Sequence, residues 1–383
     1  MSIKVVPRNF SVLCFSKGGF CFGGFMDKKL IVLKVGTSSL TKKSGETDNS
    51  KIENIIRQIC ALKNDGHNVI LVSSGAIAAG YKRLGFAKRP SSIADKQACA
   101  AVGQGLLMEE YSKLLLQESY PAAQLLLTRD DFVDRRRYKN AFNAIEVLLS
   151  RNAVPIINEN DTISIEELKL GDNDTLSAQV AAMVHADLLI LLTDIDGLYT
   201  GNPKTDESAS RIPVVEKITP EIEQLAGGAG SSNATGGMVT KINGAKLATS
   251  AGVPVVICSS KQENSVIKAV EGTADSTYFK ARKHNMKTKL QWMAFYAKSK
   301  GNLYVDDGAC KALLELNKSL LPSGIVAVEG DFKSGDVVRV FRQGSHEYIG
   351  KGICEYSKDQ LTDIIGTHGK HSEAINRNNW VEG

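Results

Sequence analysis

Short apolar runs recur along the first 280 residues, separated by longer stretches of helical length. Six runs have the length of a strand: Leu30–Val35, Asn68–Val72, Ala123–Leu127, Val154–Ile157, Leu188–Leu192 and Val253–Ile257. The longer stretches include Ser50–Lys63, Ala94–Glu118 and Tyr138–Ser150. Strands without polar alternation are typically buried on both faces, and intervening helices cover a parallel sheet on both sides. The pattern therefore predicts a three-layer α/β sandwich with a mainly parallel central sheet.

The pattern changes after Tyr278, where basic residues crowd a short polar stretch. Beyond it the apolar runs are short and separated by glycine turns, and Asp336–Phe341 and Glu347–Cys354 have the alternation of antiparallel strands. We predict an α/β domain over 28–278, a linker over 279–290 and a small β-rich domain over 291–383.

Residues 1–27 differ from the rest of the chain, because basic residues stand among phenylalanines and glycines with no acidic residue before Asp27. Lys17 and the two glycines after it interrupt the apolar core that a signal peptide needs. We expect an unstructured extension, or a start of translation at Met26. A transit peptide is the alternative.

Composition narrows the class of protein. The 383 residues suffice for two or three domains, and the net charge of +5 is too small to indicate a nucleic-acid partner by itself. The seven cysteines form no C-x-x-C pair, which argues against a zinc site or a disulfide framework. No apolar stretch reaches the roughly 18–20 residues of a membrane span. We expect a cytoplasmic protein without a membrane partner.

Small and hydroxyl-bearing residues follow the first two predicted strands. The first strand carries Lys34 near its end and leads into Gly36-Thr37-Ser38-Ser39, and the second leads into Ser73-Ser74-Gly75-Ala76, which opens a helix. Ligands of parallel sheets bind at the carboxyl ends of the strands, where free N–H groups and helix N-termini attract anions. The sequence thus predicts two anion sites facing one crevice.

Later strands lead into polar and glycine-rich segments. Asn158-Glu159-Asn160-Asp161 and Gly171-Asp172-Asn173-Asp174 offer amides for a carboxylate and acids for an ammonium group, which suits a small zwitterion. Thr193-Asp194 ends another strand, and a loop from Gly227 to Gly237 leads into a helix containing Lys241. Glycines allow close backbone approach to phosphates, and a lysine can reach one as a point charge.

The common phosphate-binding and hydrolase motifs are absent. The chain contains no G-x-x-x-x-G-K-[ST], no G-x-G-x-x-G, no H-E-x-x-H and no G-x-S-x-G. A phosphate site in this protein must therefore use another loop design.

Taken together in this order, the segments closely resemble the amino acid kinase family, and within it the kinases that act on glutamate. The resemblance rests on Lys34–Ser38, Ser74–Gly80, Asn158–Asp161, Gly171–Asp174 and Thr235–Lys241. It extends to Val305–Ala309 and Ser319–Ile325, which look like a C-terminal PUA domain. It implies the amino acid kinase fold followed by a PUA-like domain. One departure is Ser73, where the family usually has threonine.

The resemblance implies a role for each matching residue. Lys34, Lys241 and Asp174 would be catalytic, with the acid holding the two cations beside the transferred phosphoryl group. ATP would be bound by Lys34, Thr193, Asp194, Thr235, Gly236, Gly237, Met238, Val239, Thr240 and Lys241. The substrate would be bound by Ser74, Gly75, Asn158, Asp161, Asp172 and Asn173. No protein residue is expected to ligate a metal.

The implied reaction is ATP-dependent phosphorylation of the γ-carboxylate of L-glutamate, the first step toward proline. The resemblance also implies Mg²⁺ with ATP, feedback inhibition by proline, and a homo-oligomer, dimeric or tetrameric. The reaction needs no general base, because a carboxylate is already ionised at pH 7. A carboxylate at Asp161 aimed at the substrate ammonium would disfavour N-acetylglutamate, which lacks that charge.

Alternatives remain open at this stage. Taken singly, Lys34 could be a surface lysine, Ser74 a helix cap, and Asp161 a turn residue. The enzyme could be a sister kinase acting on N-acetylglutamate, aspartate, carbamate or UMP. It could also bind RNA through the C-terminal domain, but residues 281–383 carry a net charge of 15 − 12 = +3 and show no evident aromatic cluster for base stacking.

Overall fold

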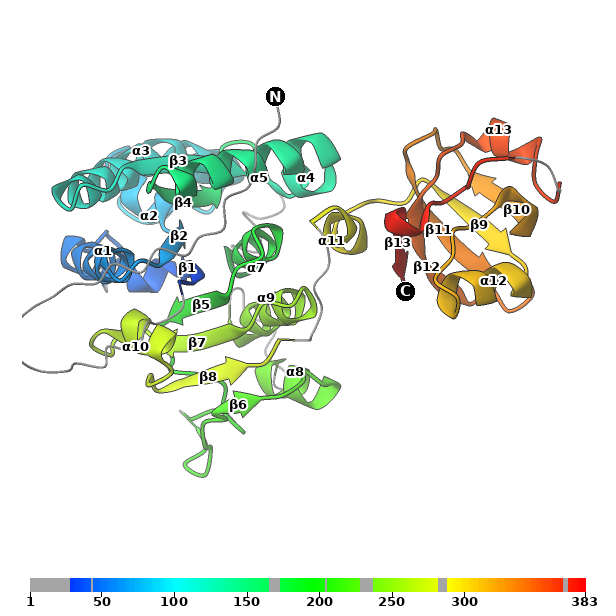
Figure 1. Cartoon of the computed structure of the whole chain (residues 1–383). Helices are drawn as coiled ribbons and strands as arrows, with labels where there is room; N and C mark the ends of the chain where they lie inside the picture. Colours follow the sequence, from blue (N-terminus) through cyan, green and yellow to red (C-terminus); the bar gives the residue numbers. More distant parts are fainter. Residues whose placement is uncertain are drawn as a thin grey trace, which may run out of the picture.

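The computed structural model describes residues 28–42, 44–164, 173–203, 205–227, 237–281, 288–367 and 371–383. The predicted extension over 1–27 and residues 282–287 of the predicted linker lie outside them. The described residues form two separate sheets (Figure 1). In spatial order the larger sheet contains β3 (Ala122–Leu127), β4 (Val154–Glu159), β2 (Asn68–Val72), β1 (Leu30–Val35), β5 (Leu188–Thr193), β7 (Val255–Ser259), β8 (Ser276–Phe279) and β6 (Val214–Val215).

The prediction of a mainly parallel sheet is confirmed. Every neighbouring pair in the larger sheet is parallel except β7 and β8. All six predicted strands occur, although the sixth begins at Val255 rather than Val253. Pro254, which lacks an N–H, falls just before the strand and contributes only its carbonyl, to Leu189 N at 3.0 Å. The short strands β8 and β6, which complete this end of the sheet, were not predicted.

Helices cover both faces of the larger sheet. Helices α1 (Asn49–Asn64), α2 (Ala76–Gly80), α3 (Ile93–Gln117) and α10 (Ser265–Glu271) pack on one face with alternate strand residues such as Ile31. The opposite face of the sheet includes residues such as Val32. It is covered by α4 (Arg129–Val133), α5 (Arg135–Ser150), α7 (Asn173–Met183), α8 (Pro220–Gly227) and α9 (Met238–Ser250).

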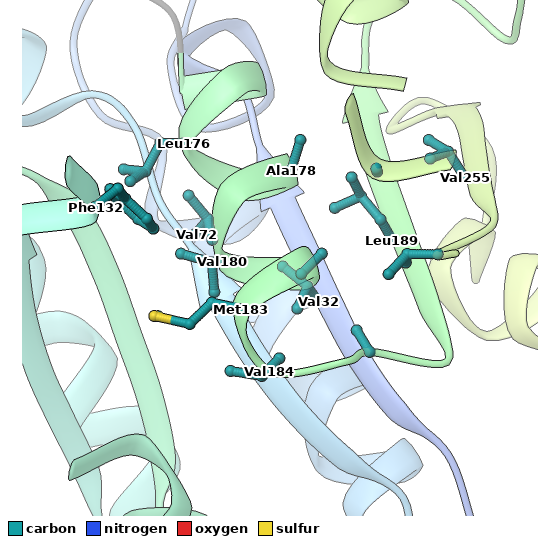
Figure 2. Close-up of a cluster of buried hydrophobic side chains, with 14 of the residues drawn as sticks. Val32, Val72, Phe132, Leu176, Ala178, Val180, Met183, Val184, Leu189 and Val255 are labelled. Atoms are coloured by element: carbon teal, nitrogen blue, oxygen red, sulfur yellow. The ribbon is translucent and has the colours of Figure 1, made fainter. Parts of the chain in front are cut away.

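Helix α7 lies over the middle strands of the sheet. Figure 2 shows Leu176, Val180 and Met183 of this helix beside Val32 and Val72 of the strands. All five side chains are at most 3% exposed. Burial of this apolar face fixes the position of the helix and hence of its first residues, which lie at the carboxyl edge of the sheet.

The smaller sheet is built from the C-terminal residues. In spatial order it contains β10 (Ile325–Gly330), β9 (Gly301–Val305), β11 (Val337–Arg342), β12 (Tyr348–Ile353) and β13 (Trp380–Glu382). Helices α12 (Asp307–Leu314) and α13 (Lys358–Thr362) share its apolar core. The predicted strands within 336–341 and 347–354 are β11 and β12, and they pair antiparallel as expected.

Helix α11 (Thr288–Phe295) lies between the two sheets in Figure 1. Trp292 and Met293 belong to the same buried cluster as α7 and as Val337, Ile353 and Val381 of the C-terminal part. The Trp292 indole N–H donates to the Phe132 carbonyl oxygen at 3.1 Å. A shared apolar core therefore joins the two parts through this helix.

The outer face of the smaller sheet carries a row of aromatic side chains that sequence inspection missed. Register places Tyr304 opposite Phe341, and Phe341 opposite Tyr348, on three neighbouring strands. The ring centroids are 5.7 and 5.6 Å apart in the two pairs, and His346 lies 5.5 Å from Tyr304. The expectation of no aromatic cluster was wrong, because the residues are far apart along the chain and only strand pairing brings them together.

Among the described residues, no helix is both long enough and apolar enough to cross a lipid bilayer.

Candidate active site

The carboxyl ends of the central strands meet at one edge of the larger sheet. There, Gly36 N donates to Leu192 O at 3.3 Å, and Ser260 N donates to Thr193 O at 2.7 Å. Ser73 N donates to Ile157 O at 2.9 Å in the same way. These bonds bring the segments after β1, β2, β4, β5 and β7 together, as the strand-end argument predicted.

A buried carboxylate joins two lysines at this edge. Asp174, the second residue of α7, lies 2.6 Å from Lys34 Nζ through Oδ1 and 3.2 Å from Lys241 Nζ through Oδ2. Thr240 Oγ1 donates to the same Oδ2 at 2.8 Å. The side chains of the lysines and the acid are at most 8% exposed. Residues from β1, α7 and α9 thus meet as predicted.

The electrostatics of this triad favour an anion. Burial alone would raise the pKa of the Asp174 carboxyl, but the charges of Lys34 and Lys241 and the hydrogen bonds it accepts outweigh burial and hold its pKa below the usual range. The carboxyl is therefore ionised at neutral pH. Two cations and one anion leave a net charge of +1 among the three groups, and a buried unbalanced charge favours a ligand of opposite sign.

A glycine permits the close approach of α7 and α9 that forms the triad. A methyl group at Gly244 would come within 3.0 Å of the Asp174 carbonyl oxygen. Gly244 lies one helical turn beyond Lys241, so the contact sets the distance between Lys241 and its acid. At the start of α9, Thr240 Oγ1 also donates to Gly237 O at 2.9 Å.

A network of amides lies directly beside the triad. Asn173 Nδ2 lies 2.7 Å from Ser73 O, 2.8 Å from Ser74 Oγ and 3.0 Å from Asn158 Oδ1, and its two hydrogens serve these three acceptors. Asn158 Nδ2 in turn donates to Gln104 Oε1 of α3 at 2.9 Å. Because Asn173 and Asp174 are consecutive, the start of α7 connects the amide network to the lysines.

Gly75 precedes helix α2 in a left-handed conformation, with φ of 94°. An L residue is strained in this region, so glycine meets a backbone requirement here. The turn directs the start of α2 toward Thr37 and Leu40, whose side chains lie 3.9 and 3.8 Å from where a Cβ would be. The two predicted glycine- and serine-containing turns therefore face each other.

The remaining predicted site residues that the structure describes lie at the end of β5, at the start of α9 and in the turn after β4. Thr193 ends β5 and donates to Asp194 Oδ1 at 3.1 Å, with Thr193 buried and Asp194 exposed. Gly237, Met238 and Val239 form the half-buried start of α9. Asp161 lies half-buried in the turn after β4. Asp172, Thr235 and Gly236 fall outside the described residues.

Sequence reasoning missed two residues of this region. Gln104 lies mid-helix, 54 residues from Asn158 in sequence, and no local pattern distinguishes it from a surface glutamine. Tyr111 is fully buried, and its hydroxyl lies 2.7 Å from Ser73 Oγ. A buried tyrosine hydroxyl needs a polar partner, but only the fold identifies Ser73 as that partner.

A mainly parallel sheet with two lysines, a paired acid and an amide network at its carboxyl edge defines an α/β phosphotransferase. Comparison with known proteins makes the class more specific. The amino acid kinase family matches residues 29–259, and the PUA domain matches residues 301–377. The glutamate 5-kinase of Streptococcus pneumoniae strain Hungary19A-6 is 56% identical over 356 residues, covering 93% of this chain and 96% of the relative.

The glutamate 5-kinase of Streptococcus sanguinis strain SK36 shows the same identity and coverage. Among solved structures, carbamate kinase from Giardia lamblia bound to AMP-PNP aligns with a TM-score of 0.49 and 18% identity, covering 67% of this chain and 99% of that one. The chain belongs to the amino acid kinase family and, within it, to the glutamate 5-kinases. Its C-terminal part is a PUA domain.

Proposed function

We propose that the protein transfers the γ-phosphoryl group of Mg·ATP to the γ-carboxylate of L-glutamate, forming γ-glutamyl phosphate and ADP. This reaction is the first step toward proline. The observation that carries the proposal is the buried Asp174 between Lys34 and Lys241, directly beside the amide network of Asn173. The names and high identity of the relatives support the same reaction.

The chemistry requires positioning and charge stabilisation rather than proton transfer. A carboxylate oxygen of glutamate forms the new O–P bond while the bond from the γ-phosphorus to the bridging oxygen breaks and ADP leaves. The attacking carboxylate is ionised at pH 7, because its pKa is about 4.3. Lys34 and Lys241 would flank the transferred group and stabilise the charge on its oxygens, while Asp174 keeps both ammonium groups in place.

Mg²⁺ would enter with ATP rather than reside in the protein. Among the described residues, no three His, Cys, Asp or Glu side chains form a group that could hold a metal ion. Asp174, the acid at the centre of the site, already contacts two ammonium groups. The ion would thus be held mainly by the phosphate oxygens, and its contribution would be neutralisation of phosphate charge.

The amide network would bind glutamate. Ser74, Asn158 and Asn173 present a hydroxyl and two amides, which suit a carboxylate, and Gly75 contributes backbone at the start of α2. We assign the α-ammonium group of glutamate to Asp161 in the turn after β4, with Asp172 as a neighbour. Loss of such a charged contact would disfavour N-acetylglutamate.

The nucleotide would bind on the other side of the triad. Thr193 and Asp194 end β5, and Gly237, Met238, Val239 and Thr240 begin α9, whose N-terminus carries partial positive charge. Thr235 and Gly236 would complete this loop. In this proposal the phosphates would lie between the start of α9 and the lysines.

We also propose that proline inhibits the enzyme by competing with glutamate. Proline offers a carboxylate and an ammonium group to the same amides and to Asp161. Proline should therefore raise the apparent KM for glutamate and leave kcat unchanged. Inhibition that lowers kcat at saturating glutamate would place proline elsewhere.

A homo-oligomer, dimeric or tetrameric, is proposed as well. Strand β3 is at the edge of the larger sheet and exposes Leu126. An exposed edge strand with apolar side chains is typical of a surface that pairs with another chain. Light scattering coupled to size exclusion should give a mass of two or four chains.

The test of substrate choice is release of ADP with glutamate, N-acetylglutamate, aspartate, carbamate or UMP as acceptor. We expect release with glutamate alone. Asn158→Ala should raise the KM for glutamate by about tenfold, the loss of one hydrogen bond to a charged group, with little change in the KM for ATP. Release that does not depend on glutamate would overturn the proposal.

RNA remains a second candidate ligand, favoured by the aromatic row of Tyr304, Phe341 and Tyr348. Arg339 lies over Phe341 at 5.6 Å, and rings with an arginine can stack bases. The test is salt-dependent retention of single-stranded RNA by the full chain and by Tyr348→Ala. Equal retention of both at low salt would exclude the row as the binding surface.

A further inference from the structure

A cleft opens where the kinase part of the chain meets the PUA domain. Its volume is about 560 Å³, within the range that holds a small organic ligand. One side is formed by residues 130–137 of α4 and α5, and the other by residues 298–300 and 335–337. Trp292 of α11 also lines it. The cleft is separate from the Asp174 triad and takes no part in the proposed reaction.

Cations outnumber acids in the lining of this cleft. Arg135, Arg137, Lys298 and Lys300 face Asp130, Asp134 and Asp336. Lys300 pairs with Asp336 at 3.0 Å, and Arg137 pairs with Asp131 at 3.2 Å. Among the residues that the structure describes, Arg135 and Lys298 form no ion pair with a carboxylate. Two cations are therefore available to a ligand, beside the carboxylates of Asp130 and Asp134, for which the described residues provide no ion-pair partner either.

The exposed Arg135 side chain packs on an aromatic ring at the edge of the cleft. The Arg135 guanidinium lies over the Trp292 ring, with its carbon 6.0 Å from the ring centroid. The indole is itself fixed by its bond to Phe132 O. A guanidinium packed on a ring keeps its N–H groups free for a carboxylate or a phosphate.

Two connections run from the cleft to the substrate side of the catalytic site. Tyr296, which follows α11, donates through its hydroxyl to Gln179 O of α7 at 3.5 Å, and α7 begins with Asn173 and Asp174. In addition, Asn160 N donates to Leu127 O at 2.9 Å, directly before α4. A shift of α4 or α11 would thus reach both the turn after β4 and the start of α7.

We propose that this cleft is a regulatory site for a small organic anion, bound by Arg135 and Lys298, whose occupancy changes the affinity of the enzyme for glutamate. The anion would carry a carboxylate, sulfonate or phosphate and an apolar body that contacts Val133, Val337 and the edge of Trp292. Binding of the anion to the cleft does not depend on which reaction the enzyme catalyses, whereas its effect on the affinity for glutamate rests on the proposed function.

The binding arm uses the fluorescent anion 8-anilinonaphthalene-1-sulfonate and the full chain, with saturating Mg·ADP present to occupy the nucleotide site. Energy transfer from tryptophan reports binding near Trp292. The double variant Arg135→Glu/Lys298→Glu should weaken binding at least fivefold. Lys318→Glu, a lysine-to-glutamate change at an exposed position in the C-terminal part, should bind like wild type. Equal affinity of all three proteins would overturn the site.

The regulatory arm measures the KM for glutamate with and without the same anion at saturating Mg·ATP. A shift of twofold or more is expected in wild type and Lys318→Glu, and none in the double variant. Cleft binding without such a shift would overturn the regulatory claim. If the wild type does not phosphorylate glutamate even without the anion, the proposed function fails, while the binding arm still decides whether the site exists.

Discussion

In the catalytic site, Lys34 and Lys241 both pair with Asp174. Removal of Lys241 should mainly affect the rate of phosphoryl transfer. Lys241→Ala should lower kcat by about 100-fold or more and change the KM for glutamate little, because contacts to the transferred group strengthen in the transition state. Steady-state kinetics with both substrates varied will test this.

Lys246→Ala is the matched control for this variant. Lys246 lies on the same helix, is exposed, and pairs with Glu223 rather than with Asp174. It should retain wild-type kcat. A Lys241→Ala enzyme with unchanged kcat would remove this lysine from the mechanism.

The lowered pKa of Asp174 has a consequence for stability. Folding favours the ionised form, so the contribution of Asp174 is present above the pKa of an unfolded aspartate, about 3.9, and is lost as pH falls through the native pKa. Asp174→Asn should cost about 3–5 kcal/mol near pH 7, because it removes the carboxylate charge that lies between two buried ammonium groups.

Urea unfolding of wild type and Asp174→Asn from pH 8 to pH 3 measures this difference. The difference should be constant down to about pH 5 and shrink below about pH 4. A difference that grows on acidification would mean that the folded protein prefers the protonated acid.

At the residue scale, the sequence predicted which side chains form the site better than it predicted the residues that hydrogen-bond to them. Lys34 and Lys241 could be singled out because one lies near the end of a buried strand and the other follows a glycine-rich loop, where ligands gather, whereas the role of Asp174 came from the family resemblance. Gln104 could not, since its contact with Asn158 depends on how α3 packs and leaves no mark in the neighbouring residues.

Helices α2 and α3 pack unusually closely, and two glycines allow it. A methyl group at Gly103 would lie 1.8 Å from the Ala76 carbonyl oxygen, and one at Gly80 would lie 2.0 Å from Cys99 O. This packing places Gln104, the residue after Gly103, beside Asn158. The glycines thus link helix packing to the amide network.

Gly103→Ala should therefore separate the two helices. We expect a loss of about 1–3 kcal/mol in the free energy of unfolding and a higher KM for glutamate, because Gln104 moves with the helix. Thermal melts and kinetics will measure both. Gly105→Ala is the control, since a methyl group there meets nothing within 4 Å. Equal stability of both variants would contradict the packing argument.

Strand positions could be predicted at the element scale because buried parallel strands are continuous apolar runs. The two-residue edge strand β6 carries no such pattern, and β8, between β7 and β6, is only four residues long with Tyr278 37% exposed. Both are held by pairing with a neighbour. Such strands depend on tertiary context, which a local pattern does not contain.

The two parts of the chain share a core through α11, so they should not unfold independently. The cluster contains Trp292 and Met293 together with Val337, Ile353 and Val381 of the PUA side. Scanning calorimetry of the wild type should give one coupled transition. Met293→Asp, which puts a charge at a fully buried position, should split it in two. Two resolved transitions in the wild type would contradict the coupling.

At the scale of the whole molecule, composition and pattern indicated a kinase part and a β-rich part, but not how they meet. The stretch before α11 is basic and polar and resembles an exposed linker, whereas Gln291 and Met293 within the helix are fully buried. The burial comes from surfaces of both parts, and neither surface can be recognised as a contact in the sequence.

The central claim is that this site places phosphate on the γ-carboxylate of glutamate, and trapping of the acyl phosphate with hydroxylamine tests it most directly. The assay contains Mg·ATP and either glutamate, N-acetylglutamate or aspartate. We expect hydroxamate from glutamate alone, and about 100-fold less or lower still from Lys241→Ala at the same protein concentration. Hydroxamate from another acceptor, or ADP release from folded protein without hydroxamate from glutamate, would contradict it.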